Sequence, residues 1–104
     1  MDILVRIKRA VIAGRHRFSG KALREMAADG LTKRDVIESV LTAKAIYKMI
    51  RSTSPFREHA RERLYVIRSR NLGGLLVYTK GKLISEEGRE TFYFLVSSKR
   101  AQWS

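Results

Sequence analysis

The sequence of 104 residues has no cysteine, a single proline, two histidines and no long apolar run. Without cysteine it can form neither disulfides nor thiolate metal sites, which fits the reducing cytoplasm. Two histidines do not supply a zinc site, so we expect neither a metal nor a cofactor. A membrane-spanning helix needs about 20 consecutive apolar residues, and no segment approaches that length. Arg6, Lys8 and Arg9 interrupt the apolar N-terminal stretch, so we expect no signal peptide and no membrane association.

Acidic residues are scarce relative to basic ones. The chain has 22 Lys and Arg against 10 Asp and Glu, which gives a formal net charge of +12. Residues 1–43 carry nine basic and five acidic side chains, and residues 44–104 carry thirteen and five. A small domain with this self-repulsion is expected to have a polyanionic partner, and nucleic acid is the leading candidate. An acidic protein is the alternative partner.

Residues 1–43 show a helical period. Ile3, Ile7 and Val11 recur every fourth position and predict a first helix, which Asp2 can cap and Gly14 can end.

Two more helices are expected after the link "RHRF". One runs from Ser19 to Gly30, and the other begins at Thr32 with Asp35 as a capping-box partner. Their apolar positions are Ala22, Leu23, Met26, Ala27, Val36, Ile37, Val40 and Leu41.

From residue 44 the period changes to two. The alternation predicts strands near 44–51, 63–70, 75–83 and 91–98, joined by short polar links. Sequential strands with such links should pair as an antiparallel meander. We therefore predict a single domain over residues 1–104. Its class is α+β, with three N-terminal helices packed on one face of a four-stranded antiparallel sheet.

Alternation also sorts the side chains by face. In the third strand, the set opposite the helices is Leu76, Tyr78, Lys80 and Lys82. In the fourth strand, Phe92, Phe94 and Val96 are expected toward the helices, and the opposite set is Tyr93, Leu95, Ser97 and Lys99. In the first strand Lys44 and Lys48 have the same parity as Ile46 and Ile50, so its facing stays open. If Lys48 joins the bare face, that face is basic and bears aromatic rings.

The chain resembles a family of bacterial toxins. The stretch "IKRAVIAGRHRFSGKALREMAADGLTKRDVIESVL" is similar to the helical opening of small domains related to the BrnT and RelE toxins. Four later segments resemble the MqsR family of mRNA-cleaving toxins from type II toxin–antitoxin systems. "AIYKMIRSTS" is similar to a "DFYKSMTT"-like strand, "ERLYVIR" to "QDVYR", "LLVYTKGKL" to "QVYLKITV" and "FLVSSKRA" to "LIVSFKEK". The resemblance implies a RelE-like fold, cleavage of single-stranded mRNA, and a cognate antitoxin that masks the protein.

Carried over residue by residue, the resemblance implies that Lys48, Tyr78 and Lys99 are catalytic. Two positions depart from the family pattern. Glu62 stands where the family has a glutamine ahead of "DVY", and Lys21 stands where many relatives have a histidine. These departures bear on the catalytic details.

The chemistry expected of such a site uses the nucleophile that RNA carries, its 2′-hydroxyl. Attack on the adjacent phosphate needs a base, an acid for the leaving oxygen and cations for the developing charge, but no metal. Lys48 and Lys99 would hold the phosphate, and Tyr78 would donate a proton or stack on a base. Glu62 or His59 would take the proton, unless Glu62 pairs with an arginine and His59 is merely exposed to solvent.

Further residues are candidates for RNA binding. Arg63 and Lys80 would grip flanking phosphates and Tyr93 would stack on a base, while Arg51 and Lys44 add to the basic surface. Three functions remain open: an endoribonuclease toxin, a non-catalytic nucleic-acid-binding module on the same fold, and a basic module for an acidic protein. The sequence leaves the oligomeric state open, a monomer included.

Overall fold

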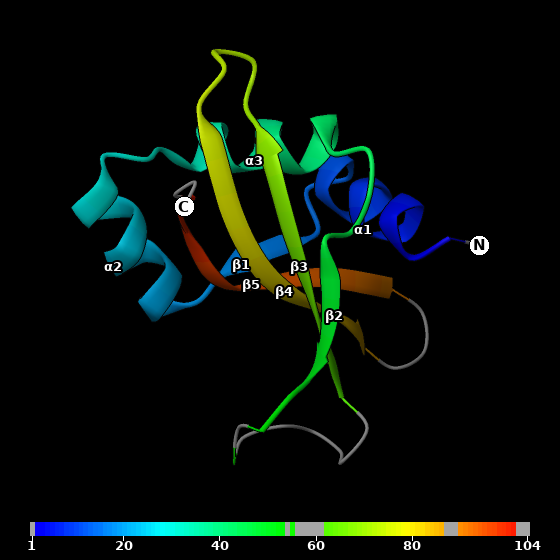
Figure 1. The fold of residues 1–104 in the computed structure, drawn as a ribbon. Helices are drawn as coiled ribbons and strands as arrows, with labels where there is room; N and C mark the ends of the chain where they lie inside the picture. The colour runs from blue at the N-terminus through cyan, green and yellow to red at the C-terminus, as the bar shows by residue number, and fades with distance from the viewer. Residues whose placement is uncertain (1, 54, 56–61, 87–89, 102–104) are drawn as a thin grey trace.

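The computed structural model describes residues 2–53, 55, 62–86 and 90–101, and its class is α+β, as predicted. Figure 1 shows α1 and α3 behind the sheet and α2 beside it. The helices are α1 (Ile3–Ile12), α2 (Gly20–Asp29) and α3 (Lys33–Thr42). The strands are β1 (His16–Phe18), β2 (Lys48–Arg51), β3 (Arg63–Arg70), β4 (Leu76–Glu86) and β5 (Glu90–Arg100). None of the helices in the described ranges is long and apolar enough to cross a membrane.

The helix boundaries follow the predicted capping residues closely. The Ser19 hydroxyl accepts a hydrogen bond from the backbone N–H of Ala22, and Gly30 ends α2 with a φ of 70°. Thr32 and Asp35 form the predicted capping box, each side chain accepting from the backbone N–H of the other. These bonds satisfy N–H groups that the first turn of a helix leaves without a partner.

The sheet has five strands in the order β1-β5-β4-β3-β2, rather than the predicted four. The prediction missed β1, because "RHRF" was interpreted as a link. β1 pairs in parallel with β5, where His16 lies opposite Tyr93 and Phe18 opposite Leu95. Three residues are too short to show a period of two, so only the pairing with a distant strand makes this segment a strand. The other strand pairs are antiparallel, and the sheet is therefore mixed.

A β-bulge in β5 decides which of its side chains share a face. β4 and β5 pair Lys80 with Ser97 but pair Gly81 with Leu95, so Val96 is an extra residue. An extra residue reverses the alternation of the strand beyond it. Consequently, odd-numbered residues of β5 before the bulge face the helices, whereas even-numbered residues do so after it.

Because of the bulge, the predicted facing of the first half of β5 is wrong. Tyr93 was expected beside Lys99 on the bare face, but it points into the core, where its exposed fraction is 0%. Phe92 and Phe94 were expected toward the helices, but they lie half-buried on the other face. Uniform alternation failed here because it cannot anticipate an inserted residue.

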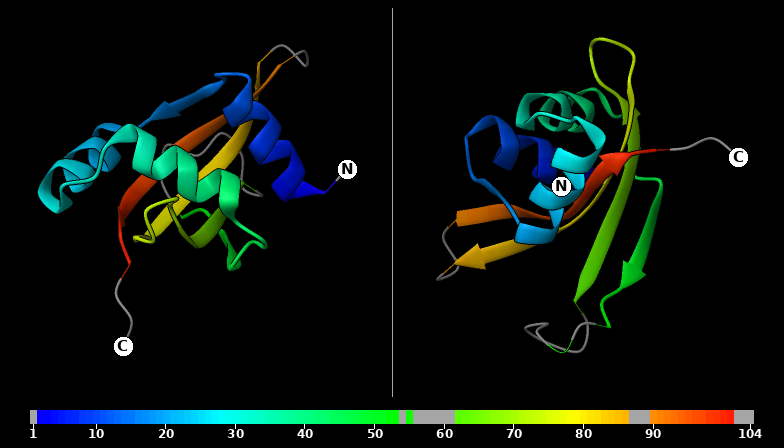
Figure 2. Two further views of the ribbon diagram at one scale, coloured as in Figure 1. Left: turned by 90° about the horizontal axis from the view of Figure 1, so that it is seen from above. Right: turned by 90° about the vertical axis from the view of Figure 1, so that its left-hand side faces the viewer.

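The core lies between the sheet and the helices α1 and α3. Its fully buried side chains come from α1, from α3 and from the three central strands, and Figure 2 shows these layers from two sides. Burial of this apolar surface is the main force that holds the helices on one face of the sheet. The central residues of this cluster are Ile7, Val36, Val40, Ile67, Val77, Tyr93 and Leu95.

Helix α2 covers the edge of β5 beyond the end of β1. The Glu25 carboxylate accepts hydrogen bonds from Ser97 Oγ at 2.7 Å and from the Ser98 backbone N–H at 3.2 Å. The Asp29 carboxylate accepts from the backbone N–H of Arg100 at 2.8 Å. An uncovered edge strand would present these amides to other chains. The two carboxylates satisfy them and place the end of α2 beside Lys99.

Candidate nucleic-acid interface

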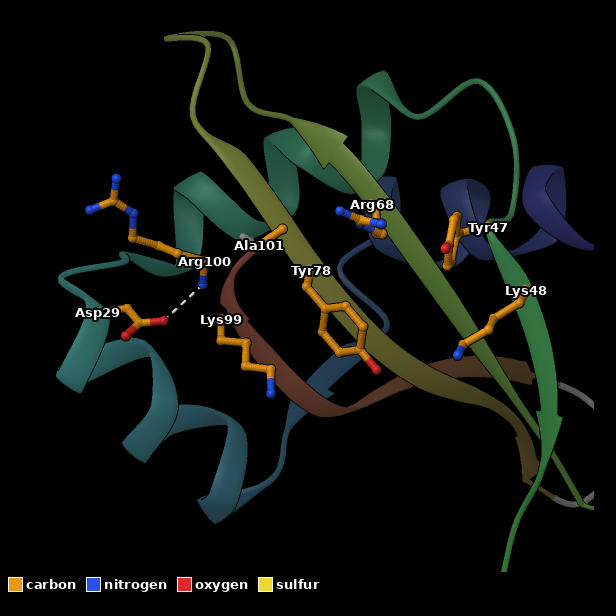
Figure 3. A pocket seen from close by; sticks show the side chains of 8 residues that line it. All are labelled: Asp29, Tyr47, Lys48, Arg68, Tyr78, Lys99, Arg100 and Ala101. Carbon is orange, nitrogen blue, oxygen red and sulfur yellow. Dashed lines mark hydrogen bonds between the residues drawn. The ribbon is translucent and has the colours of Figure 1, made fainter. Parts of the chain in front are cut away.

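A cleft of about 590 Å³ opens on the sheet face away from α1 and α3. Figure 3 shows the side chains that line it, which come from α2, from the start of β2 and from strands β3, β4 and β5. We call this hollow the main cleft, and its lining residues are Asp29, Tyr47, Lys48, Arg68, Tyr78, Lys99, Arg100 and Ala101.

The register of the sheet brings the cations and rings of the main cleft together. Tyr78 on β4 lies directly between its cross-strand partners, Arg68 on β3 and Lys99 on β5. Lys48 on β2 pairs with Val66, two positions before Arg68. Adjacent strands are about 4.8 Å apart, so the three steps from β5 to β2 span roughly 14 Å. The main cleft therefore gathers basic groups from three strands, β2, β3 and β5, around the Tyr78 ring of β4 within a few nucleotide diameters.

Two cation–ring pairs stand in the main cleft. Lys99 Nζ lies 5.3 Å from the centre of the Tyr78 ring, and Arg68 Cζ lies 5.0 Å from the centre of the Tyr47 ring. Both distances are within the range of a cation–π attraction. In Figure 3 the Lys48 side chain extends toward Tyr78 from the opposite side to Lys99. The phenol of Tyr78 thus stands between two ammonium groups.

Burial and charge set the protonation of two groups on this face. Burial, reinforced by the negative charge of Glu25, raises the pKa of Tyr78, so its hydroxyl stays protonated and can donate near neutral pH. Burial lowers the pKa of Lys80, and the nearby cations Lys21, Lys99 and Lys48 lower it further, against an opposing effect of Glu25. Burial is the main cause, and the surrounding cations add to it, so both disfavour the charged form of Lys80.

Three of the predicted catalytic residues come together in the main cleft: Lys48, Tyr78 and Lys99. Lys80 lies beside them. Val66 on β3 pairs with Lys80 on one side and with Lys48 on the other. Val66 is fully buried between these two lysines. Lys44 is exposed and lines a second hollow that adjoins the main cleft.

The remaining predicted residues lie elsewhere. Tyr93 is fully buried, so it cannot stack on a base, and burial raises the pKa of its hydroxyl. Arg51 and Arg63 lie opposite each other on β2 and β3, and alternation turns both away from the face that bears Lys48. This geometry does not support the predicted grip of Arg63 on phosphates that flank Lys48, and it places the positive charge of Arg51 on the other face. His59 lies outside the described residues.

Glu62 does not line the main cleft. Its two carboxylate oxygens lie 3.1 and 3.2 Å from Nζ of Lys82, and both side chains are largely buried. Glu62 is therefore ion-paired, and Lys82 is a described partner, whereas the sequence had led us to expect an arginine. A carboxylate held by a cation in this way is a poor proton acceptor, because the ion pair favours its charged, unprotonated form.

We expect the Glu62→Gln substitution to lower the free energy of unfolding by roughly 1–3 kcal/mol, because it leaves the buried ammonium of Lys82 without its counter-charge. Thermal melting at neutral pH measures this loss. If Glu62 is structural, single-turnover RNA cleavage by the folded variant should stay within about tenfold of the wild type. A loss of a hundredfold or more in the folded variant would instead assign it the role of base.

Sequence reasoning did not place Tyr47 and Arg68 in the site. Arg68 is not among the residues singled out from the sequence, yet it lies opposite Tyr78 across the β3–β4 hairpin. The hairpin closes at the pair Arg70–Leu76, and two positions further along this register pairs Arg68 with Tyr78. Tyr47 lies just before β2 and is anchored by its backbone N–H, which donates to the Val66 carbonyl at 2.8 Å.

Comparison of the chain with protein-family models, with curated proteins and with solved structures finds no match. The function is therefore inferred from the geometry and charge of the main cleft.

Proposed function

We propose that this protein is a metal-independent endoribonuclease of the RelE and MqsR type, which cleaves single-stranded RNA in the main cleft. One observation carries the proposal: Lys48, Tyr78 and Lys99, which lie far apart in the sequence, line a single open cleft. Helices α1 and α3 cover one face of the mixed sheet and leave the main cleft open on the other face, which supports the proposal. The high positive charge suits both an mRNA substrate in the cytoplasm and an antitoxin that covers the cleft.

The main cleft fits a single strand better than a duplex. Its aromatic side chains, Tyr47 and Tyr78, can stack only on bases that are not already stacked in a helix. Lys48, Lys99 and Arg68 supply the positive charge that follows a phosphate backbone. Tyr47 in particular is 58% exposed, although a tyrosine usually buries much of its ring.

In the proposed reaction the 2′-oxygen attacks the neighbouring phosphorus and the bond from phosphorus to the 5′-oxygen breaks. The products are a 2′,3′-cyclic phosphate and a 5′-hydroxyl end. Lys48 and Lys99 stabilise the charge that develops on the phosphoryl oxygens. Such electrostatic stabilisation is usually the largest single contribution to catalysis. Tyr78, kept protonated by its raised pKa, donates a proton to the departing 5′-oxygen. The proton of the attacking 2′-hydroxyl passes to solvent water, which then returns a proton to Tyr78.

A specific observation favours the second candidate, a nucleic-acid-binding module without catalysis. Among the described residues, the carboxylates nearest the main cleft are Asp29 and Glu25, and both accept hydrogen bonds from β5. Glu62 is paired with Lys82 and does not line the cleft, so no described carboxylate is placed as a dedicated base. Binding without cleavage needs only the cations and rings of the main cleft. A third candidate, a basic module for an acidic protein, gives no account of the exposed rings among the cations.

Purified protein, single-stranded RNA and excess EDTA distinguish these candidates. For the endoribonuclease we expect cleavage that survives the chelator, yields 2′,3′-cyclic phosphate ends and is lost when the RNA has 2′-deoxy residues. Salt-sensitive binding without cleavage would establish the binding module instead. Absence of RNA binding at low salt would leave the acidic protein partner.

A further inference from the structure

A second hollow of about 520 Å³ adjoins the main cleft. The two hollows share Tyr47 and Arg68, so this cation–ring pair forms the wall between them. Lys44 and Ala45, in the segment that joins α3 to β2, also line the second hollow, as does Leu76 of β4. Its volume lies within the roughly 300–1,000 Å³ that is usual for small-ligand sites.

The lining of the second hollow suits a planar base attached to a phosphate. Leu76, the Ala45 methyl group and the Tyr47 ring offer apolar surface, and Arg68 Cζ stands 5.0 Å from the centre of that ring. Lys44, three residues before Tyr47, adds an exposed lysine to the lining. A nucleobase can stack on rings and guanidinium planes, while its phosphate pairs with an ammonium group.

Hydrogen bonds hold the walls of the second hollow in place. The Thr42 hydroxyl donates to the Arg70 carbonyl at 2.6 Å, which ties the end of α3 to the end of β3. The Arg70 side chain donates to the Gly74 carbonyl at 2.7 Å. On the other side the Tyr47 backbone is bonded to β3. A site whose walls are already fixed loses less entropy when it binds a ligand.

We infer that the second hollow binds one nucleotide of a single-stranded RNA whose neighbouring residues occupy the main cleft. The inference rests on the proposed binding of RNA, and it deepens that proposal by defining the substrate as a strand that crosses the Tyr47–Arg68 pair. The base enters the hollow beside Leu76, and a phosphate meets Lys44. Very short oligonucleotides occupy the main cleft alone and do not gain from this subsite.

Fluorescence anisotropy with 2′-O-methyl oligouridylates of two to six nucleotides tests the inference, because blocked 2′-oxygens prevent cleavage. For the full chain we expect the affinity to rise with length, and to rise by about tenfold when the added base enters the second hollow. Ala45→Glu places a carboxylate in this hollow. It should abolish that rise while changing the affinity for the dinucleotide by no more than about twofold.

Lys44→Gln should weaken hexanucleotide binding several-fold, whereas Lys33→Gln, which removes the same charge from the exposed start of α3, should not. The side chains of Lys33, Lys44 and Ala45 are exposed, so the melting temperatures of the three variants should match that of the wild type. If the variants keep the full gain with length, the subsite is wrong while RNA binding stands. If no oligonucleotide binds at any length, the proposed function itself is wrong, and the subsite with it.

Discussion

Lys48→Ala is expected to slow RNA cleavage by roughly 10²–10³-fold, the usual effect of removing one group that stabilises transition-state charge. The physical reason is the position of Lys48 across the main cleft from Lys99, with the protonated phenol of Tyr78 between them. Single-turnover cleavage of a short RNA in EDTA measures the rate. Because the Lys48 side chain is exposed, its removal should leave the melting temperature nearly unchanged.

The matched control is Lys33→Ala, which removes an exposed lysine from the start of α3, away from the main cleft. Both variants lower the net charge equally, so only a loss specific to Lys48 supports a catalytic role. Expression in a bacterial host gives a second measurement, in which the wild type should arrest growth and Lys48→Ala should not. Equal growth of the two strains, or equal cleavage by the two variants, would contradict the assignment.

Gly81→Ala is expected to be the most destabilising small substitution on the sheet. A methyl group at this position would lie 2.6 Å from Cζ and 2.7 Å from the hydroxyl oxygen of Tyr93, and 2.8 Å from the Phe94 carbonyl oxygen. Overpacking of this kind costs about 1–3 kcal/mol. For a domain of this size each kcal/mol lowers the melting temperature by roughly 4–8 °C, which calorimetry or circular dichroism can measure.

Gly73→Ala provides the control for Gly81→Ala. Its added methyl group would meet only Asn71 Oδ1 at 3.5 Å, an ordinary contact, so the change in stability should be within about 0.5 kcal/mol. Combining Gly81→Ala with Tyr93→Leu should destabilise by less than the sum of the two single changes, because the smaller side chain makes room for the methyl group. Strict additivity would show that Tyr93 is not the source of the strain.

The contact between Gly81 and Tyr93 also bears on the site. Gly81 follows Lys80 at the bulge, and the ring of Tyr93 fills the space above its missing side chain. This arrangement lets β5 bury Tyr93 and Leu95 at one end and expose Lys99 at the other. Without the extra residue, a strand with Tyr93 in the core would turn Lys99 toward the helices. The position of Lys99 on the basic face therefore depends on the bulge and on the packing of Tyr93 against Gly81.

Coverage of the β5 edge by α2 has a similar consequence. The carboxylates of Glu25 and Asp29 accept hydrogen bonds from backbone amides of β5, which hold both groups at the edge of the sheet. Glu25 still acts on the charges around it, since it opposes the lowering of the Lys80 pKa. Acidic side chains of α2 thus lie close to the main cleft, and one of them favours the charged form of a neighbouring lysine.

Local patterns in the sequence were enough to predict the three helices, their capping residues and four of the five strands. These features depend on contacts between near neighbours: Ser19 with the start of α2, Thr32 with Asp35, and the turn after Arg70. The high net charge likewise needs no structure, and it alone indicates a polyanionic partner. Lys48, Tyr78 and Lys99 could be singled out from the sequence because the resemblance to the MqsR family pointed to them.

Tertiary structure decided the remaining features, each of which depends on residues far apart in the chain. β1 exists only because β5 offers it an edge, and Val96 is a bulge only because of how β5 pairs with β4. For the same reason Tyr93 is buried, while Tyr47 and Arg68 meet at the wall between the two hollows. A period of two describes one strand by itself. The pairing of strands, which depends on the packing of the whole sheet, determines the face on which each side chain lies.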